Sequence, residues 1–486
     1  MQLNYFKFIK KLIFIFPIVF SSCEGDFLDT SPNTSIDQAN AFSTPEKILA
    51  QVNGLYGQLQ NQNLYGGRFI VFNEQRGDEF GQNDGNAATG SAVWNQNVAS
   101  TNEYINNVWA VAYSTINAAN ILIKQLTQTQ IISDSLSKHY IAEAKFVRAL
   151  SFLCLVQTYA KPFNLDKTAL GVPIRLQAIT SEGYNDLARS SVEEVYKQIL
   201  LDLDEAEKDL PLSYNTPLLN VARAHKSSAI ALKTRVFLNQ SDFQRLVLEA
   251  SKLVSNTVPF QYIAPGISHS LEPFVTNLYT GSYVGSEAIF SIPFANSNTE
   301  TPASQYSLAY NYLGQPIIFL ASAGIVSDSA FINAEDGRSK LVGINQAKLK
   351  VLKKFAITTA PFRDYVPVVR YAEVLLNYAE AAAQLGDLNL AFNLLQSVRH
   401  RSNPNFQFSA DVASSKENLV SAILRERRIE FLGEGLRLQD LQRLVKPLPA
   451  KTGSIGTAPE VLPNAKNYIW PIPSAELSTN KLCLPN

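Results

Sequence analysis

Apolar side chains recur at helical spacing along much of the chain, and the clearest case begins at Tyr371. From there to Leu385, apolar residues fall at i, i+3, i+4 and i+7, which places them on one face of an α-helix. Gly386 and Asp387 then break the pattern, as a helix C-terminus followed by a turn should. A second stripe starts at Leu388, so the sequence predicts a helical hairpin of tetratricopeptide size.

The same amphipathic pattern recurs at 137–160, 191–211, 222–254 and 417–444. The last two of these segments read as helix, short turn, helix. Helical hairpins are therefore predicted in both halves of the chain.

Two long stretches, 61–103 and 259–350, lack this period and are rich in Asn, Gly, Ser and Tyr. The second contains short β-like runs such as "EAIFSIPF" at 287–294. Loops of this length in a compact domain are usually functional or unstructured. We predict a mainly α fold: tetratricopeptide-type hairpins form a right-handed helical scaffold that carries long irregular loops and a few short β-strands.

The balance of charge argues against nucleic acid as a partner. Lys plus Arg and Asp plus Glu both number 42, and beyond the N-terminus only "RERR" at 425–428 clusters basic residues. No apolar stretch reaches the roughly 20 residues that a membrane-spanning helix needs. Aromatic residues make up 10% of the chain, enough to supply some exposed aromatic surface.

The N-terminus has the pattern of a secretory signal. Three lysines within the first eleven residues precede the apolar run 12–20, and the small residues Ser21 and Ser22 follow. Cys23 stands where a bacterial lipoprotein carries its acylated cysteine, although Phe20 is bulkier than the Leu usual three places upstream. We predict a lipoprotein signal peptide over 1–22 and lipidation of Cys23. The alternative is an ordinary signal peptide with an incidental cysteine.

The other two cysteines, Cys154 and Cys483, offer no spacing for zinc or for a disulfide framework. Cys154 lies in the apolar run "SFLCLVQTY", where it reads as a small buried hydrophobe. No disulfide is expected.

Sequence signatures of enzymes are missing. The four histidines are far apart, and neither a G-x-S-x-G elbow nor a P-loop occurs. A carboxylate pair of the glycosidase kind leaves no sequence signature, because its separation is spatial. The segment "RGDEFGQNDGN" at 76–86 is dense in oxygen ligands and could hold a structural Ca²⁺, or it could be a solvated loop. We predict a non-enzyme without a cofactor, the Ca²⁺ being the one alternative.

Motifs spread along the chain together resemble those of the SusD/RagB family. The segment from Cys23 reads "CEGDFLDTSPNTSIDQANAFSTPEKILAQVNGLYGQL". Further matches follow in family order: "AEAKFVRALSFLCLVQTYAKPF", "GVPI", "SSVEEVYKQILLDLDEAEKDLP", "SEAIFSIPF", "RYAEVLLNYAEAAAQLGDLNLAFNLLQSVRHRSN", "ILRERRIEFLGEGLRLQDLQR" and "YIWPIPSAEL". The resemblance spans nearly the whole mature chain.

The resemblance implies a nutrient-binding lipoprotein on the surface of the outer membrane of a Gram-negative bacterium. Members of the family capture oligosaccharides, or in some cases peptides, and deliver them to a SusC/RagA-type TonB-dependent transporter. Glu24 and Asp26 resemble the acidic signal that sends such lipoproteins to the outer leaflet. The alternative is a tetratricopeptide-type scaffold that binds only proteins. The long loops rich in Asn, Tyr and Trp favour nutrient binding.

The resemblance also implies two halves packed as one globular unit. The N-terminal half is 23–255, with a ligand-face loop over 61–107. The C-terminal half is 256–486, with the loop-rich 259–350, hairpins over 368–444 and a C-terminal segment.

Recognition of a neutral sugar needs flat aromatic faces together with amides and carboxylates. The 61–107 loop supplies both kinds, and 279–283 offers a second wall; the candidate ligand-binding residues are Arg76, Asp78, Glu79, Trp94, Asn95, Tyr279 and Tyr283. The alternative for Trp94 is a place in the core beside Trp109.

Two of the most diagnostic motifs are interpreted as structural. Glu373 and Glu380 are expected to form ion pairs between packed helices with Arg370, Arg399, Arg427 and Arg428. The run "WPIP" at 470–473 cannot continue a helix and is expected to fasten the C-terminal segment across the bundle.

Overall fold

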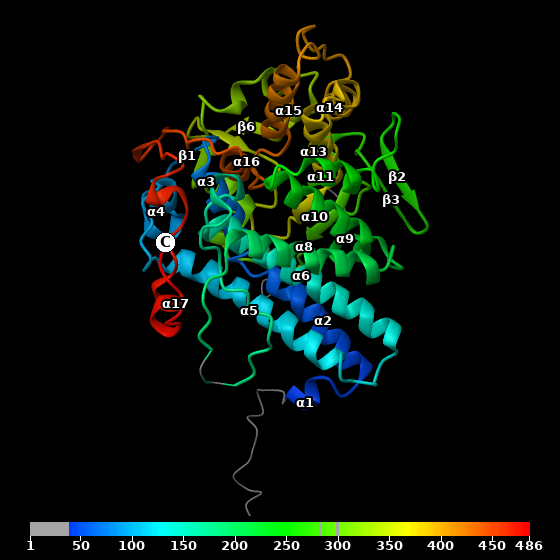
Figure 1. The fold of residues 1–486 in the computed structure, drawn as a ribbon. Coiled ribbons are helices and arrows are strands. Elements are labelled where there is room, and N and C mark those ends of the chain that lie inside the picture. Colours follow the sequence, from blue (N-terminus) through cyan, green and yellow to red (C-terminus); the bar gives the residue numbers. More distant parts are fainter. Residues whose placement is uncertain (1–37, 182, 184, 281–282, 298–300) are drawn as a thin grey trace, which may run out of the picture.

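Most of the chain is placed in the computed structural model, which describes residues 38–181, 183, 185–280, 283–297 and 301–486 (Figure 1). The predicted signal peptide, 1–22, and Cys23 lie outside these residues, so both remain predictions. Within the described ranges, none of the helices is both long and apolar enough to cross a membrane.

Three long helices form the lower layer in Figure 1: α2 (Pro45–Leu59), α5 (Glu103–Leu126) and α6 (Asp134–Tyr159). Helix α2 packs on both α5 and α6, which also pack on each other, and the short α1 (Gln38–Ala41) precedes it. The C-terminal half of α6 is buried nearly all round. This helix therefore forms the centre of the N-terminal half.

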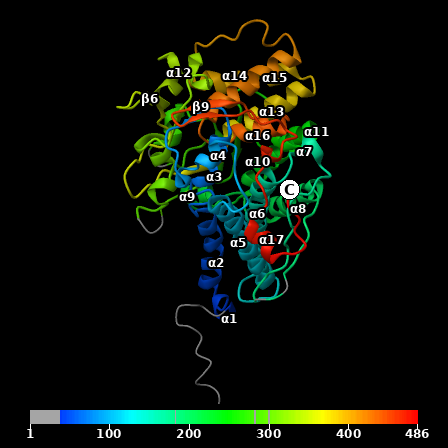
Figure 2. The same ribbon diagram turned by 90° about the vertical axis from the view of Figure 1, so that its left-hand side faces the viewer.

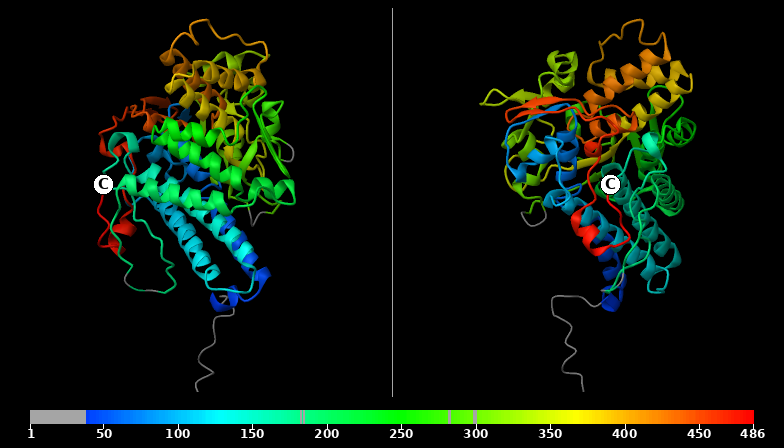
Figure 3. Two further views of the ribbon diagram at one scale, coloured as in Figure 1. Left: turned by 45° about the vertical axis from the view of Figure 1, so that its right-hand side comes forward. Right: turned by 60° about the vertical axis from the view of Figure 1, so that its left-hand side comes forward.

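From α6 onward, the long helices stack in nearly the order of the sequence. Each packs on the next along the series α6, α8 (Val192–Asp209), α10 (Lys226–Asn239), α11 (Phe243–Ala250), α13 (Tyr371–Gln384), α14 (Leu388–Ser402) and α15 (Lys416–Glu430). Figure 3 shows this stack rising from the lower helices toward α14 and α15. The hairpins predicted from the apolar stripes are confirmed, including the pair that begins at Tyr371.

Local sequence explains where these helices start. Ser191 begins α8 with a capping box: its hydroxyl accepts from the backbone N–H of Glu194, whose carboxylate accepts from the Ser191 N–H at 2.8 Å. Asp387 accepts from the Leu390 N–H in the turn between α13 and α14. Each cap satisfies a backbone donor that the helix itself leaves unpaired.

Shorter helices connect or cover this stack: α3 (Arg68–Arg76), α4 (Ser91–Trp94), α7 (Phe163–Asp166), α9 (Pro217–Ala222), α12 (Ser329–Ile332), α16 (Arg437–Arg443) and α17 (Ser474–Thr479). The C-terminal segment is held against α6, because the backbone N–H of Trp470 donates to the Thr158 carbonyl at 3.0 Å. The expected role of "WPIP" is thereby confirmed.

All strands in the described residues are short, and they pair in antiparallel twos: β1 (Phe80–Gln82) with β5 (Ile318–Leu320), β2 (Gln261–Ala264) with β3 (Ile267–Ser270), β4 (Ala288–Ile292) with β8 (Val366–Arg370), β6 (Val342–Ile344) with β7 (Lys350–Leu352), and β9 (Lys451–Gly453) with β10 (Gly456–Ala458). Strand β4 lies in the predicted run "EAIFSIPF". The mainly α fold class with a few short strands is confirmed.

The predicted loop over 61–107 is wrong where the structure forms helices, at α3, at α4 and at the start of α5. Helix α3 occupies Arg68–Arg76 with all its residues buried, and α5 already begins at Glu103. The segment "RFIVFNEQR" is only nine residues long and holds its four apolar side chains in one run, so it shows no helical period. The irregular part of this region is correspondingly shorter.

Cys154 and Cys483 are free and buried, and Cys154 is the packed hydrophobe that its surroundings predict. Burial raises the pKa of the Cys154 thiol. Such a thiol is a packing group without reactive character.

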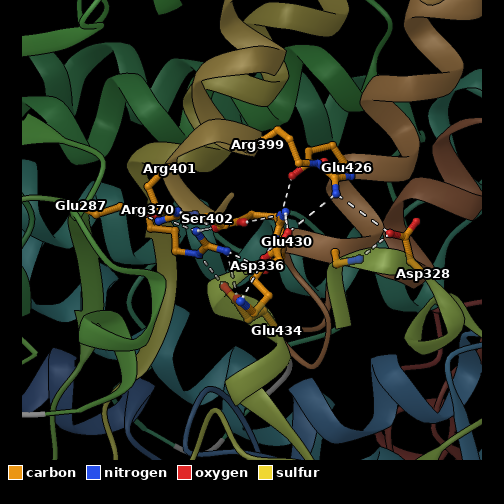
Figure 4. A network of polar contacts seen from close by, with 12 residues as sticks. Glu287, Asp328, Asp336, Arg370, Arg399, Arg401, Ser402, Glu426, Glu430 and Glu434 are labelled. Atoms are coloured by element: carbon orange, nitrogen blue, oxygen red, sulfur yellow. Dashed lines mark hydrogen bonds and ion pairs between the residues drawn. The ribbon is translucent and has the colours of Figure 1, made fainter. Parts of the chain in front are cut away.

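Charged side chains meet beneath α14 and α15 in a cluster that we call the charge network (Figure 4). Its members in the described chain are six cations, Arg338, Lys354, Arg370, Arg399, Arg401 and Arg425, and six carboxylates, Glu287, Asp328, Asp336, Glu426, Glu430 and Glu434. All of them except Arg425, whose side chain is 64% exposed, are buried or nearly so, and each is paired with an opposite charge, as burial requires. The network joins α14 and α15 to β8, to Glu287 just before β4 and to the segment 328–354.

Ion pairing of the two glutamates on α13 is confirmed, but with other partners than expected. Glu373 pairs with Arg235 of α10, and Glu380 pairs with Arg443 of α16, each at 2.6 Å. Arg427, expected beside them, pairs with Asp440 instead. These pairs hold α13 to the helices on both of its sides.

Candidate functional site

Two of the predicted ligand residues are occupied by arginines from the C-terminal half. Asp78 accepts from Arg437 Nε at 2.6 Å, and Glu79 accepts from Arg428 Nε at 2.7 Å. Glu79 also accepts from the Ile325 N–H at 2.6 Å. Burial and the neighbouring Asp78 charge raise the pKa of Glu79. Both carboxylates tie the chain after α3 to α15 and α16, and the structure gives a ligand role for them no support.

Trp94 is fully buried, with an exposed fraction of 0%. Its indole N–H donates to the Phe80 carbonyl at 3.0 Å, and the Lys451 ammonium lies 5.5 Å from the ring centroid. No ring face is exposed to stack on a sugar, so the core alternative describes Trp94 better. The expected neighbour differs, because the rings of Trp109 are packed on Tyr113 and Tyr159.

Asn95 follows α4 as its C-terminal cap, and its backbone N–H donates to the Ser91 carbonyl at 2.9 Å. Its side chain is half-buried. A ligand contact by Asn95 stays a prediction.

The two tyrosines of the expected second wall differ in exposure. Tyr279 is buried, and its hydroxyl donates to Glu434 of the charge network at 2.7 Å. Tyr283 is half-buried, stacks on Tyr365 with ring centroids 4.8 Å apart, and donates to Asp364 at 2.7 Å. Neither shares a described contact with Trp94, so the structure does not bring the two predicted walls together.

Exposed polar groups gather where the chain leaves β1. We define the polar face by six residues from three separate segments, namely Asn83, Asp84, Asn86, Phe319, Thr452 and Ser454. All are exposed except Phe319, which is half-buried. The three segments meet because β1 pairs with β5 and also packs on β9. In Figure 3 (right), the orange β9–β10 hairpin lies over the blue segment that contains β1.

Hydrogen bonds hold the polar face in one shape. The Asn83 N–H donates to the Ile317 carbonyl at 2.8 Å, and the Ser454 hydroxyl donates to Asn83 Oδ1 at 3.1 Å. Asp84 accepts from the backbone and side-chain amides of Asn86 at 3.1 and 3.0 Å. The face is therefore preorganised, which lowers the entropic cost of binding.

One aromatic ring belongs to the polar face, and two more flank Arg68, whose Nη2 donates to the Ala88 carbonyl at 3.1 Å. The Phe319 ring lies so close over Gly81 that a Cβ there would stand 2.5 Å from its Cζ, so the strand needs glycine. Nearby, the Arg68 guanidinium is sandwiched between Tyr104 and Tyr306 at 4.2 and 4.0 Å from the ring centroids. Both tyrosines are half-buried, so each keeps some accessible ring surface.

Arg76 lines a cavity of about 420 Å³ between the chain around 96–98 and the C-terminal segment 463–471. Its Nη2 donates to the carbonyl of Tyr468 at 2.7 Å and to that of Asn467 at 3.3 Å. Its Nε donates to Gln96 Oε1 at 3.4 Å. Burial lowers the pKa of Arg76 to about 10. Figure 2 faces the side of the molecule from which α4, α17 and β9 are seen, where these segments lie.

The structure offers no centre for a metal ion among the residues that it describes, where no group of three or more His, Cys, Asp or Glu is suitably placed. In the segment predicted as a calcium loop, Asp78 and Glu79 are paired with arginines. Asp84 and Asn86 are exposed and bonded to each other. The donor set does not fit Ca²⁺, and the binding of a metal stays untested.

Comparison with protein families places the chain. A family model described as "Starch-binding associating with outer membrane" matches residues 26–238, and one described as "SusD family" matches residues 357–484. A solved SusD superfamily protein from Bacteroides fragilis is 32% identical, covers 91% of this chain and 99% of its own, and superposes with a TM-score of 0.81. This chain belongs to the SusD family.

Further SusD-like proteins match at lower identity over almost their whole length. SusD-like protein P38 of Formosa agariphila is 24% identical, with 96% of this chain and 95% of that protein aligned. A solved structure named "Laminarin binding SusD-like protein" is 20% identical, covers 91% of this chain and 99% of its own, and has a TM-score of 0.69. The last match shows the shared fold alone.

Sequence reasoning missed most of the polar face and of the cavity. Phe319 and Ser454 are hundreds of residues from Asn83, and neither belongs to a motif. The cavity likewise brings Arg76 together with residues 463–471, which are far from it in the sequence. Only the dense polar run 76–86 indicated that this region faces outward.

Proposed function

We propose that this SusD-family protein is a cell-surface lipoprotein that captures oligosaccharides and delivers them to a SusC/RagA-type TonB-dependent transporter. Membership in a family whose model is described as starch-binding and associated with the outer membrane supports this. The name of the laminarin-binding neighbour favours a glycan ligand over a peptide. Lipid attachment at Cys23 and a position facing the exterior belong to the same proposal.

The observation that carries the proposal within this chain is the polar face. A neutral glycan presents hydroxyls and flat C–H surfaces, so its recognition needs amides, a carboxylate and an aromatic ring. Asn83, Asp84 and Asn86 supply the first two on a fixed loop, and Phe319 supplies the ring beside them. Asp78 and Glu79 are held in ion pairs with arginines, whereas none of the residues of the polar face forms an ion pair in the described chain.

Titration calorimetry with laminarin-derived and starch-derived oligosaccharides tests the site. Phe319→Ala should weaken binding about fivefold, the effect of one lost aromatic contact of about 1 kcal/mol. Phe274→Ala is the matched control, because Phe274 is 69% exposed and lies in another loop. Equal affinity of the parent and both variants would remove the polar face from the ligand site.

Co-purification in mild detergent tests delivery to a transporter. A stable complex with a large TonB-dependent barrel is expected, because permanent interfaces bury on the order of 2,000 Å² or more. Isolation of this chain alone from native membranes would contradict the partner. Isolation with soluble proteins and without a barrel would favour the tetratricopeptide-type scaffold.

A further inference from the structure

Arg76 is a buried cation that lines the cavity of about 420 Å³ without a carboxylate side chain beside it among the described residues. Arg76 is 1% exposed, and among the described residues its hydrogen-bond partners include no carboxylate. Its charge is met by two backbone carbonyls, the Gln96 amide oxygen and the face of the Trp470 ring, whose centroid lies 5.9 Å from the guanidinium carbon. Within the described chain, Arg76 Nη1 and the indole Nε1 of Trp470, a second wall residue, have no hydrogen-bond partner.

Arg76 differs from the buried arginines of the ion-pair networks and resembles Arg68 and Arg189, which are also buried and bond to backbone carbonyls among the described residues. Arg370 contacts three glutamates, and Arg443 pairs with Glu380 and Asp440. A buried guanidinium ordinarily needs such a partner, because loss of hydration is costly for a charge. The positive charge of Arg76 therefore favours an anion in the cavity beside it.

Two further cations stand at the mouth of the cavity. Lys161 and Lys466 line it and are exposed, and the described lining includes no Asp or Glu side chain, its one carboxylate being the terminal group of Asn486. The carboxylate paired with Lys161, that of Asp166, is 3.7 Å away and exposed, so it offsets little of the charge. Three cations around one concave space concentrate positive potential there.

The remaining walls suit a sugar ring. Side-chain amides of Gln96, Asn464 and Asn467 line the cavity and can bond hydroxyls, while Val98 and Pro471 provide apolar surface. A volume of about 420 Å³ lies within the range of roughly 300–1,000 Å³ common for small-ligand sites. The space therefore suits one saccharide unit better than a long chain.

We propose that this cavity is a second saccharide subsite that takes a hexuronic acid unit, whose carboxylate faces the field of Arg76, Lys161 and Lys466. The proposal rests on the proposed capture of glycans and names an acidic sugar as part of what is captured. A free hexuronate and a hexuronate at the end of an oligosaccharide present the same carboxylate and the same ring hydroxyls.

Calorimetry with sodium galacturonate and sodium glucuronate tests the subsite, with glucose, galactose and sodium acetate as comparisons. We expect a hexuronate to bind, neutral hexoses to bind at least about tenfold more weakly, and acetate to compete poorly. Higher salt should weaken binding, because the attraction is between charges. A trisaccharide ending in hexuronate that binds more tightly than the free sugar would identify the oligosaccharide as the source, and equal binding would identify the free acid.

Variants of the two exposed lysines test the cations without disturbing the core. Lys466→Gln and Lys161→Gln should each weaken hexuronate binding about two- to fivefold, the effect of one partly exposed ion pair. Lys208→Gln is the matched control, since Lys208 is exposed on α8, away from the cavity lining. Melting temperature, measured on each variant, should stay unchanged.

Three results would overturn the subsite: equal binding of glucose and glucuronate, equal competition by acetate, or unchanged affinity in both lysine variants. Phe319→Ala should leave hexuronate binding intact, because Phe319 belongs to the polar face. Loss of neutral-glycan binding alone would count against the proposed function and not against this subsite.

Discussion

Glu430 lies at the centre of the charge network, and removing its charge gives the sharpest test of the fold. Its carboxylate accepts from Arg370 Nη1 at 2.7 Å and from Arg401, and Arg338 Nη1 lies 3.4 Å away. Burial alone would raise the pKa of Glu430, but these arginines hold that pKa well below its usual range. Glu430→Gln keeps the shape of the side chain and leaves six cations facing five carboxylates.

The size of the effect follows from the cost of an unpaired buried charge. Removal of one partner from a buried pair costs about 3–5 kcal/mol. Unfolding entropy of about 2.1 cal/mol/K per residue over roughly 450 residues gives about 0.9 kcal/mol/K, so the Tm should fall by about 3–5 °C. Thermal unfolding followed by circular dichroism measures the shift, and urea unfolding measures the free energy.

Glu417→Gln is the matched control, because this side chain is 76% exposed and its partner Lys416 is 3.9 Å away. Its free energy of unfolding should change by less than about 0.5 kcal/mol. Adding Arg401→Gln to Glu430→Gln restores the balance of charge, so the double variant should lose less than the sum of the single variants. A Glu430→Gln protein that melts within 1 °C of the parent would refute the reasoning.

Three further predictions concern separate parts of the molecule. Burial lowers the pKa of the stacked His225 to about 4 and of His269 to about 3. Because the unfolded chain titrates near 6.5, it binds more protons between about pH 3 and 6.5, and stability should fall on acidification through this window. His269→Phe should reduce that slope by up to one proton in urea titrations at several pH values, and an unchanged slope would contradict the burial effect. Trp94→Ala should lower the free energy of unfolding by about 3–5 kcal/mol in urea, since a fully buried ring is lost; intact stability would place the ring outside the core. Cys23→Ala should abolish labelling by palmitate and release the protein from the membrane fraction, and a labelled variant that still sediments with membranes would contradict lipidation.

Helical hairpins are predictable from this sequence because their apolar residues keep the helical period over several turns. The stripe after Tyr371 and the cap at Ser191 both depend on residues that are close together in the sequence. Both match the structure. Helix α3 carries no such signal, since it spans only nine residues and holds its four apolar side chains in one run. Its existence depends on packing by segments far along the chain.

The ligand residues were harder to predict, because burial of an aromatic or charged side chain is a long-range property. Trp94 stands among polar residues in the sequence, yet β9 covers it so closely that a Cβ at Gly453 would lie 3.1 Å from its ring. Asp78 likewise finds its partner in Arg437. The family resemblance supplied the fold and the kind of ligand, but no local pattern distinguishes a buried Trp94 from an exposed one.

Capture of glycans is the central claim, and electrophoresis of the purified chain through native gels that contain polysaccharides tests it most directly. Laminarin, starch and a hexuronate-containing polysaccharide would be compared with a gel that contains none. We predict that at least one polysaccharide retards the parent chain, and that Phe319→Ala reduces the retardation by a neutral one while Phe274→Ala does not. Unretarded migration in every gel, with a protein partner recovered from membrane extracts instead, would contradict glycan capture.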